Sequence, residues 1–387
     1  MDKENYINIF DIGSSKIRFS VFDKNLNNIF SDNIYKEKDA DIIDYSNKIN
    51  KIIKKAEKKI FNHIEDVVIA TDTKKLITID ISIKEKFDNE MQLNKIYENI
   101  LKEIKHLINY NYPKYEIIHL IVTKAIMDKN EYLEIPKKNI CVKNISVDFK
   151  VICFPKKLIE NLNLNFTKCN LEIKNIFCTS YLKSEICLKK FNSEDISFLE
   201  IGLERSSLII YKNRKISSIN VIPIGGLSIT KDIAKIFNIE FEDAEKIKKL
   251  FNKSGSEFSY DQNLIESNLP IVEIIKKNIS IDLLKKVILY RVQEIIDLSF
   301  KPTTINSVNQ KLKNFDLYLL GEGSKLLNNN SFHINDKFGF NSINFYDQSD
   351  IDICNNVLLY HLNNYKNPKN LLKTKGFFEK FFNFFSK

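Results

Sequence analysis

Residues 6–22, YINIFDIGSSKIRFSVF, place a short glycine turn between two apolar segments. Both flanks are rich in aromatic and β-branched residues, as strands are, so the stretch predicts a hairpin with its turn at 11–16. At such a turn, backbone N–H groups and hydroxyls hold phosphate oxygens, Lys16 adds a cation, and Asp11 holds Mg²⁺ through water. An ordinary hairpin, in which Gly13 only forms the turn, is the alternative interpretation.

Residues 196–211, ISFLEIGLERSSLIIY, repeat this arrangement about 190 residues later. When the two hairpins are aligned on their glycines, Asp11-Ile12-Gly13 matches Glu200-Ile201-Gly202. A short self-similarity of this kind indicates an internal duplication. We therefore expect two similar lobes, each built around one hairpin.

Glycine is scarce in this chain, with nine among 387 residues, well below the usual share of about 7%. The glycines that remain are expected where the backbone needs positive φ or a close approach to another group. Gly225 and Gly226 follow an apolar strand and open a helix, whose first N–H groups favour an anion. Gly321 and Gly323 follow an apolar strand at 315–320, where a flat base or a phosphate could approach the backbone.

The composition excludes several classes of protein. With 43% hydrophobic and 11% aromatic residues the chain buries a sizeable core, and no segment approaches the roughly 20 apolar residues needed to span a bilayer. Six scattered cysteines without a Cys-x-x-Cys pair, and an N-terminus without an apolar signal region, predict a cytoplasmic protein without disulfides or a cysteine-bound metal. The tail 366–387 carries +5 of the net charge of +9, so the nearly neutral body predicts no nucleic-acid partner.

Between the hairpins, helical and strand-like periodicity alternate. Helices are predicted over 49–60 and 93–108, and strands at 67–70, 77–83, 115–122 and 145–154. We interpret residues 78–152 as a small inserted α+β subdomain. Helical periodicity returns after Gly226, begins again near Phe241, and resumes over 271–300.

In this order the elements resemble the actin/Hsp70/hexokinase superfold, and within it the FtsA family of bacterial cell-division proteins. The resemblance rests on DIGSSK at 11–16, VIPIGG at 221–226, ITKDIA at 229–234 and DAEKIK at 243–248. It covers the chain essentially end to end. It implies an α/β fold, the two-lobed actin-like ATPase fold of duplicated ribonuclease H-like lobes, with an inserted α+β subdomain in lobe 1.

The resemblance also implies domain bounds and a site for ATP and Mg²⁺. Lobe 1 consists of residues 1–77, 153–190 and about 340–365, with the subdomain 78–152 inserted in it. Lobe 2 consists of residues 191–237 and 305–339, with 238–304 as its subdomain. The tail consists of a basic linker at 366–375 and an amphipathic helix at 376–387. Nucleotide contacts fall on Asp11, Gly13, Ser14, Ser15, Lys16, Glu200, Gly202, Gly225, Gly226, Glu245, Lys248, Gly321, Gly323 and Ser324. Among these, Glu245 and Lys248 would face the ribose and adenine. Asp11 and Glu200 would hold the metal.

The second glycine turn departs from the family pattern. Where the family has Asp-Ile-Gly-Gly-Gly-Thr, this chain has Glu200-Ile-Gly-Leu-Glu-Arg205, and Glu322 replaces a glycine of the third loop. Leu203 and Glu204 keep the backbone away from phosphate, and the carboxylate of Glu204 repels anionic oxygens. We therefore assign no catalytic residue and expect at most a weak ATPase.

The last twelve residues, GFFEKFFNFFSK, give the clearest physical signal. Spaced about 100° apart around a helix, the phenylalanines fill one face and the polar residues fill the other. The membrane-binding set is Phe377, Phe378, Phe381, Phe382, Phe384, Phe385 and Lys380. A helix docked on the core is the alternative. Burial of each ring in lipid, about 1.5–3 kcal/mol, and attraction of nearby lysines to an anionic leaflet favour a membrane-surface anchor.

The resemblance predicts a protein that binds ATP, self-assembles into filaments, and tethers FtsZ to the cytoplasmic face of the inner membrane at the division site. Arg291 and Glu294 would contact the acidic C-terminal peptide of FtsZ, and 78–152 would bind other division proteins. A solvated helical Arg291 is the alternative interpretation of that residue. Two other functions stay open: a small-molecule kinase of the same superfold, and a non-enzymatic actin-like adaptor for pilus assembly.

Overall fold

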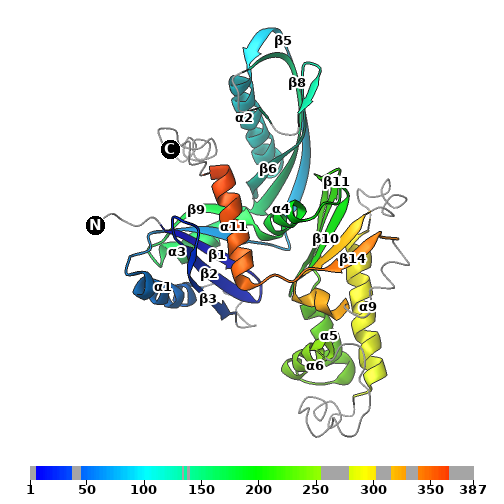
Figure 1. The fold of residues 1–387 in the computed structure, drawn as a ribbon. Helices are drawn as coiled ribbons and strands as arrows, with labels where there is room; N and C mark the ends of the chain where they lie inside the picture. Colours follow the sequence, from blue (N-terminus) through cyan, green and yellow to red (C-terminus); the bar gives the residue numbers. More distant parts are fainter. Residues whose placement is uncertain are drawn as a thin grey trace. The chain divides into compact units, whose positions relative to one another are not determined.

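The computed structural model describes residues 6–36, 45–132, 135–136, 140–253, 279–301, 315–327 and 339–365 (Figure 1). The chain divides into two compact units, residues 1–190 with 349–387, and residues 191–348. Each unit contains a five-stranded mixed sheet. Among the described helices, none combines the length and the apolar character needed to cross a membrane.

The sheet of the first unit has the strand order β3-β2-β1-β4-β9. Its strands are β1 (Ile7–Ile12), β2 (Lys16–Phe22), β3 (Asn28–Tyr35), β4 (Asp66–Thr71) and β9 (Glu172–Cys178). β1 pairs antiparallel with β2, and β2 with β3, whereas β1, β4 and β9 run parallel. The hairpin expected at residues 6–22 is therefore confirmed.

Helices cover both faces of this sheet. They are α1 (Ser46–Ile60), α3 (Lys156–Thr167), α4 (Thr179–Lys190) and α11 (Asp350–Tyr365). α1 and α3 share a core with Phe10 and Phe19, whose rings stack 4.3 Å apart. Because side chains alternate along a strand, Asp11 and its cross-strand partner Arg18 lie on the opposite face, where α11 contacts β1 and β2.

The sheet of the second unit has the order β12-β11-β10-β13-β14. Its strands are β10 (Ile196–Ile201), β11 (Ser206–Lys212), β12 (Lys215–Ile222), β13 (Asp316–Leu320) and β14 (Ser342–Phe345). The first three pair antiparallel, and β10, β13 and β14 run parallel. The order and directions repeat those of the first unit, which confirms the internal duplication.

The helices of the second unit form one core with its sheet. They are α5 (Gly226–Phe237), α6 (Phe241–Lys253) and α9 (Ile281–Ser299), followed by the short 3₁₀ helix η2 (Glu322–Leu327). Ile229 and Ile233 of α5 are fully buried, and so are Leu284, Ile288 and Ile295 of α9. The spacing of these apolar residues is that of a helix face turned toward a core.

A separate four-stranded antiparallel sheet, with the order β5-β8-β6-β7, lies in the first unit. Its elements are β5 (Ile77–Gln92), α2 (Leu93–Asn111), β6 (Tyr115–Met127), β7 (Asn130–Tyr132) and β8 (Cys141–Pro155). α2 runs along this sheet (Figure 1), and the two share their own apolar core. The elements span residues 77–155, where the sequence places the inserted subdomain at 78–152.

One expected domain bound differs from the structure. The sequence assigns residues from about 340 to lobe 1, but β14 pairs parallel with β13, so residues up to 348 belong to the second unit. Asp316 fixes this edge strand by accepting hydrogen bonds from Asn341 and Ser342 at 2.9 and 2.6 Å. The four-residue strand carries too little pattern to reveal its partner. The basic linker and amphipathic helix predicted at 366–387 lie outside the described residues.

Candidate functional site

The first glycine turn joins β1 to β2. The N–H of Gly13 donates to the carbonyl of Lys16 at 3.0 Å and closes the turn. Ser14 and Ser15 are exposed at its tip, whereas Asp11 is only 2% exposed near the end of β1. The turn therefore combines accessible backbone and hydroxyl groups with a buried carboxylate.

The carboxylate of Asp11 is held by two protein donors. Its Oδ2 accepts from Nη1 of Arg18 at 2.7 Å, and its Oδ1 accepts from the hydroxyl of Thr179 at 2.8 Å. Thr179 is the first residue of α4. Asp11 is thereby fixed between β2 and α4.

The two cations of β2 meet at a second carboxylate, that of Asp350 at the start of α11. Lys16 Nζ donates to both of its oxygens at 2.7 and 2.9 Å, and Arg18 Nε donates to Oδ1 at 2.6 Å. Asn33 of β3 donates to Oδ2 at 3.0 Å. We call Asp11, Lys16, Arg18, Thr179 and Asp350 the turn-1 cluster.

The protonation states within this cluster follow from burial and charge. Burial alone would lower the pKa of Arg18, but the negative charges and hydrogen bonds of Asp11 and Asp350 outweigh it and raise that pKa. Burial would likewise raise the pKa of Asp350, yet hydrogen bonds from Lys16 and Arg18 bring it below its ordinary value. Two cations thus face two carboxylates, and their formal charges cancel.

The cluster fits an anion better than it fits Mg²⁺. Both oxygens of Asp11 already accept hydrogen bonds, and an arginine occupies the space beside Oδ2. Mg²⁺ in phosphate sites is usually held by one or two carboxylates with water and phosphate oxygens. No group of three or more His, Cys, Asp or Glu side chains among the described residues could hold a metal ion. Lys16 and Arg18 are the groups suited to phosphate.

The second glycine turn joins β10 to β11 and repeats the geometry of the first. The N–H of Gly202 donates to the carbonyl of Arg205 at 2.9 Å. Arg205 lies 3.8 Å from the carboxylate of Glu200 and also donates to the hydroxyl of Ser207. Glu204 is exposed. As in the first turn, an arginine pairs with the acidic residue of the first strand.

The start of α5 is tied to this second turn. The N–H groups of Gly226 and Leu227 donate to the carbonyls of Gly202 and Leu203 at 2.9 and 2.7 Å. A Cβ at Gly225 would lie 2.5–2.8 Å from three backbone atoms of residues 202–205. The expectation that these first N–H groups favour an anion is therefore wrong for Gly226 and Leu227, because the turn already uses both.

The third glycine pair follows β13. Gly321 has φ +83°, and a Cβ there would lie 2.7 Å from the carbonyl oxygen of Ile201. A Cβ at Gly323 would lie 2.6 Å from Cγ2 of Ile201. Ser324 donates its hydroxyl to the carbonyl of Gly321 at 2.6 Å. A positive φ is confirmed for Gly321 and a close approach for both glycines, and the group approached is the end of β10. Approach of a base or a phosphate to these glycines stays a prediction.

Glu245 and Lys248 of α6 form a largely buried ion pair that is hydrogen-bonded to α5. Lys248 is 7% exposed, and its Nζ donates to Glu245, to the hydroxyl of Thr230 and to the carbonyl of Gly226 at 2.7–3.0 Å. Burial would raise the pKa of Glu245, but hydrogen bonds from Lys248 and Thr230 lower it. The described contacts of this pair are with the protein, and contact with ribose and adenine stays a prediction.

Arg291 of α9 forms a bridge to α5. Its Nη2 donates to Asp232 at 2.9 Å, and its Nη1 pairs with Glu294 one turn along the same helix. The hydrogen bonds that Arg291 donates to the carboxylate of Asp232 are the main reason that the pKa of Arg291 is raised. The side chain of Arg291 is 27% exposed, so part of it faces solvent.

Three residues of the turn-1 cluster were not found from the sequence: Arg18, Thr179 and Asp350. Arg18 had a usable signal, because it lies two residues after Lys16 on the same face of β2 and opposite Asp11. Thr179 and Asp350 had none, since the hydrogen bonds that join them to the cluster span 168 residues and more than 330 residues of chain.

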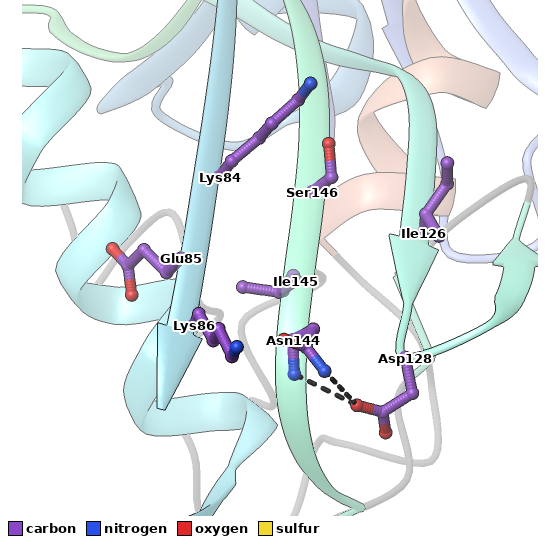
Figure 2. Close-up of a pocket in the computed structure, with 8 residues that line it drawn as sticks. All are labelled: Lys84, Glu85, Lys86, Ile126, Asp128, Asn144, Ile145 and Ser146. Atoms are coloured by element: carbon purple, nitrogen blue, oxygen red, sulfur yellow. Dashed lines mark hydrogen bonds between the residues drawn. The ribbon is translucent and has the colours of Figure 1, made fainter. Parts of the chain in front are cut away.

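A separate hollow of about 280 Å³ lies on the four-stranded sheet (Figure 2). It is lined by Lys84, Glu85, Lys86, Ile126, Asp128, Asn144, Ile145 and Ser146. Asp128 accepts hydrogen bonds from the backbone N–H groups of Lys143 and Asn144 at 3.1 and 2.9 Å. The hollow contains none of the residues assigned to nucleotide.

The two units have the same strand order, and in each the first strand carries an acidic residue near its end and is followed by a glycine turn. These features define an actin-like ATPase fold. The chain is similar in fold to a chain of the solved PilM–PilN type IV pilus biogenesis complex. The TM-score is 0.61 with 15% sequence identity, over 90% of this chain and 89% of that one. The fold class expected from the sequence is confirmed.

Within this fold the chain is similar to proteins of the FtsA family. The family described as Cell division protein FtsA matches residues 198–338. FtsA of Staphylococcus epidermidis is 23% identical over 273 residues, which are 68% of this chain and 58% of that protein. FtsA of Bacillus subtilis is 23% identical over 265 residues, 64% and 58% of the two chains. The resemblance is confirmed over 64–68% of this chain rather than end to end, and the matches span little more than half the length of these relatives.

Proposed function

We propose that this protein is an FtsA-like cell-division protein that links FtsZ filaments to the cytoplasmic face of the inner membrane at the division site. The observation that carries the proposal is the family match over residues 198–338, which include α9 with Arg291 and Glu294. The C-terminal segment 376–387 supplies the lipid contact, through its phenylalanines and Lys380. Further division proteins bind at residues 78–152.

The proposed mechanism is binding rather than catalysis. The turn-1 cluster takes the phosphates of ATP through Lys16 and Arg18. Three features support at most a weak ATPase. In each turn an arginine pairs with the acidic residue of the first strand, and the first N–H groups of α5 are hydrogen-bonded to the second turn. The second turn also carries the side chains of Leu203 and Glu204. Self-association into filaments multiplies weak tail insertions, so the assembled protein holds membrane by avidity.

A second candidate is an adaptor in pilus assembly. It is favoured by one observation, the similarity in fold to a chain of the PilM–PilN complex over 90% of this chain. A sequence identity of 15% supports a similarity in fold and nothing about function, whereas the relatives found by sequence are FtsA proteins. Binding of the C-terminal peptide of FtsZ separates the two candidates, because only the cell-division function requires it.

The proposed phosphate contact predicts that Lys16→Ala weakens ATP binding. Loss of one of two cations is expected to reduce affinity by about ten-fold or more, measured by isothermal titration of the full chain. Lys55→Ala is the matched control, because Lys55 forms an exposed ion pair with Asp32 in the same unit. Equal ATP affinity in the wild type, Lys16→Ala and Lys55→Ala would remove the assignment of the first turn.

A further inference from the structure

The carboxylate of Asp350 occupies the two cations that the proposed phosphate site needs. We propose that Asp350 is an internal competitor: it holds Lys16 and Arg18 when no ligand is bound, and a phosphate group must displace it. This inference rests on the proposed binding of ATP at the first turn. It makes Asp350 a residue that sets the affinity and the anion requirement of that site.

The geometry around Asp350 is that of an anion in a binding site. Four donor contacts of 2.6–3.0 Å converge on its two oxygens, from the ammonium of Lys16, the guanidinium of Arg18 and the amide of Asn33. These donors come from two neighbouring strands, β2 and β3. Ammonium, guanidinium and amide groups are also the side chains that hold phosphate oxygens.

The charge balance of the turn-1 cluster explains why Asp350 would lower its affinity for a phosphate. Lys16 and Arg18 are balanced by Asp11 and Asp350, so an approaching phosphate meets a neutral cluster. Removing the charge of Asp350 leaves a net charge of +1 beside the exposed tip of the turn. Because the cluster is partly buried, this charge is only partly screened by water.

Of the two carboxylates, Asp350 is the one placed to leave. Asp11 is 2% exposed and is also held by the hydroxyl of Thr179. The side chain of Asp350 is 30% exposed. The start of α11 does not depend on it, because Ser349 and Asp352 cap the helix: the Asp352 N–H donates to the Ser349 hydroxyl, and the Ser349 N–H donates to the Asp352 carboxylate, at 3.1 and 3.0 Å.

The test is the affinity of the full chain for inorganic triphosphate and for ATP, by isothermal titration. Asp350→Asn keeps the size of the side chain and removes its charge, so it is expected to bind both ligands about ten-fold more tightly than the wild type. Asp350→Glu restores the charge and is expected to return to within about two-fold to three-fold of wild-type affinity. Asp32→Asn removes one carboxylate of the same unit outside the cluster and is expected to leave affinity unchanged.

Two results would overturn the inference while leaving the proposed ATP site intact. One is a wild-type protein that binds triphosphate and an Asp350→Asn protein that binds it no better. The other is an equal gain in Asp32→Asn, which would show a general charge effect. If neither the wild type nor Asp350→Asn binds triphosphate or ATP, the proposed nucleotide site fails and the competitor role fails with it.

Discussion

Replacing Gly225 by alanine is expected to lower the free energy of unfolding by about 3 kcal/mol, the range of a severe overpacking change. The new Cβ would lie 2.5 Å from the carbonyl oxygen of Gly202, 2.7 Å from that of Leu203 and 2.8 Å from the N of Arg205. All three are backbone atoms, which cannot rotate away as a flexible side chain can. The second turn or the start of α5 must therefore shift.

The neighbouring glycine is a matched control for this prediction. A Cβ at Gly226 would meet its nearest atoms at 3.5 and 3.6 Å, which is ordinary van der Waals contact. Because Gly226 begins α5, Gly226→Ala is expected to leave stability unchanged or to raise it by up to about 1 kcal/mol. Urea denaturation followed by circular dichroism measures both variants. Equal stability of the two variants would contradict the close packing between the second turn and α5.

The second large effect is an acid dependence of stability caused by His119. This side chain of β6 is 4% exposed, and its Nε2 accepts the backbone N–H of Cys178 at 2.9 Å. Burial lowers the pKa of His119 from 6.5 to about 3. The unfolded chain therefore takes up this proton near pH 6.5, whereas the folded protein resists it until about pH 3.

The sign of the effect follows from that difference in pKa. The contribution of neutral His119 to stability is complete above pH 6.5 and is lost as the pH falls toward 3. We expect a loss of about 1.4 kcal/mol per pH unit once His119 titrates in the unfolded chain, or about 3 kcal/mol between pH 6.5 and 4. The measurement is the free energy of unfolding by urea at a series of pH values.

His119→Gln isolates this contribution from those of other titrating groups. The amide of glutamine offers an oxygen to the N–H of Cys178 and does not titrate, so the slope between pH 6.5 and 4 should become shallower. An identical slope in His119→Gln and the wild type would show that His119 is not the titrating group.

Local patterns in the sequence were sufficient to predict much of the fold. The first hairpin, the second hairpin and α1 were predicted from residues adjacent in the chain or one helical turn apart, and all three are present. The repeat of Asp11-Ile12-Gly13 at residues 200–202 predicted the duplication, which the matching strand orders confirm. Each of these features depends on contacts between near neighbours in the sequence.

Long-range contacts account for what the sequence did not predict. Gly225 was expected to be special because it opens a helix, but its described role is contact with the backbone of the second turn, 20–23 residues earlier. Asp350 joins Lys16 across more than 330 residues, and β14 has only four residues with which to indicate its sheet. No periodicity within a segment encodes such partners.

The turn-1 cluster was likewise predicted only in part from the sequence. The sequence identified Asp11 and Lys16 and the chemistry suited to a phosphate. It did not reveal that Arg18 neutralises Asp11, or that Asp350 neutralises Lys16, because both depend on strand register and on where α11 packs. The proposed ATP affinity is therefore governed by residues outside the motif.

The most direct test of the proposed cell-division function is recruitment of labelled FtsZ to vesicles that contain anionic lipid. The full chain is compared with a chain that ends at Asn370, which lacks the phenylalanine-rich segment. We expect the full chain to recruit FtsZ and the shortened chain to leave it in solution. A full chain that binds vesicles without recruiting FtsZ would contradict the FtsZ-tethering function, and one that binds no vesicles would contradict the membrane anchor.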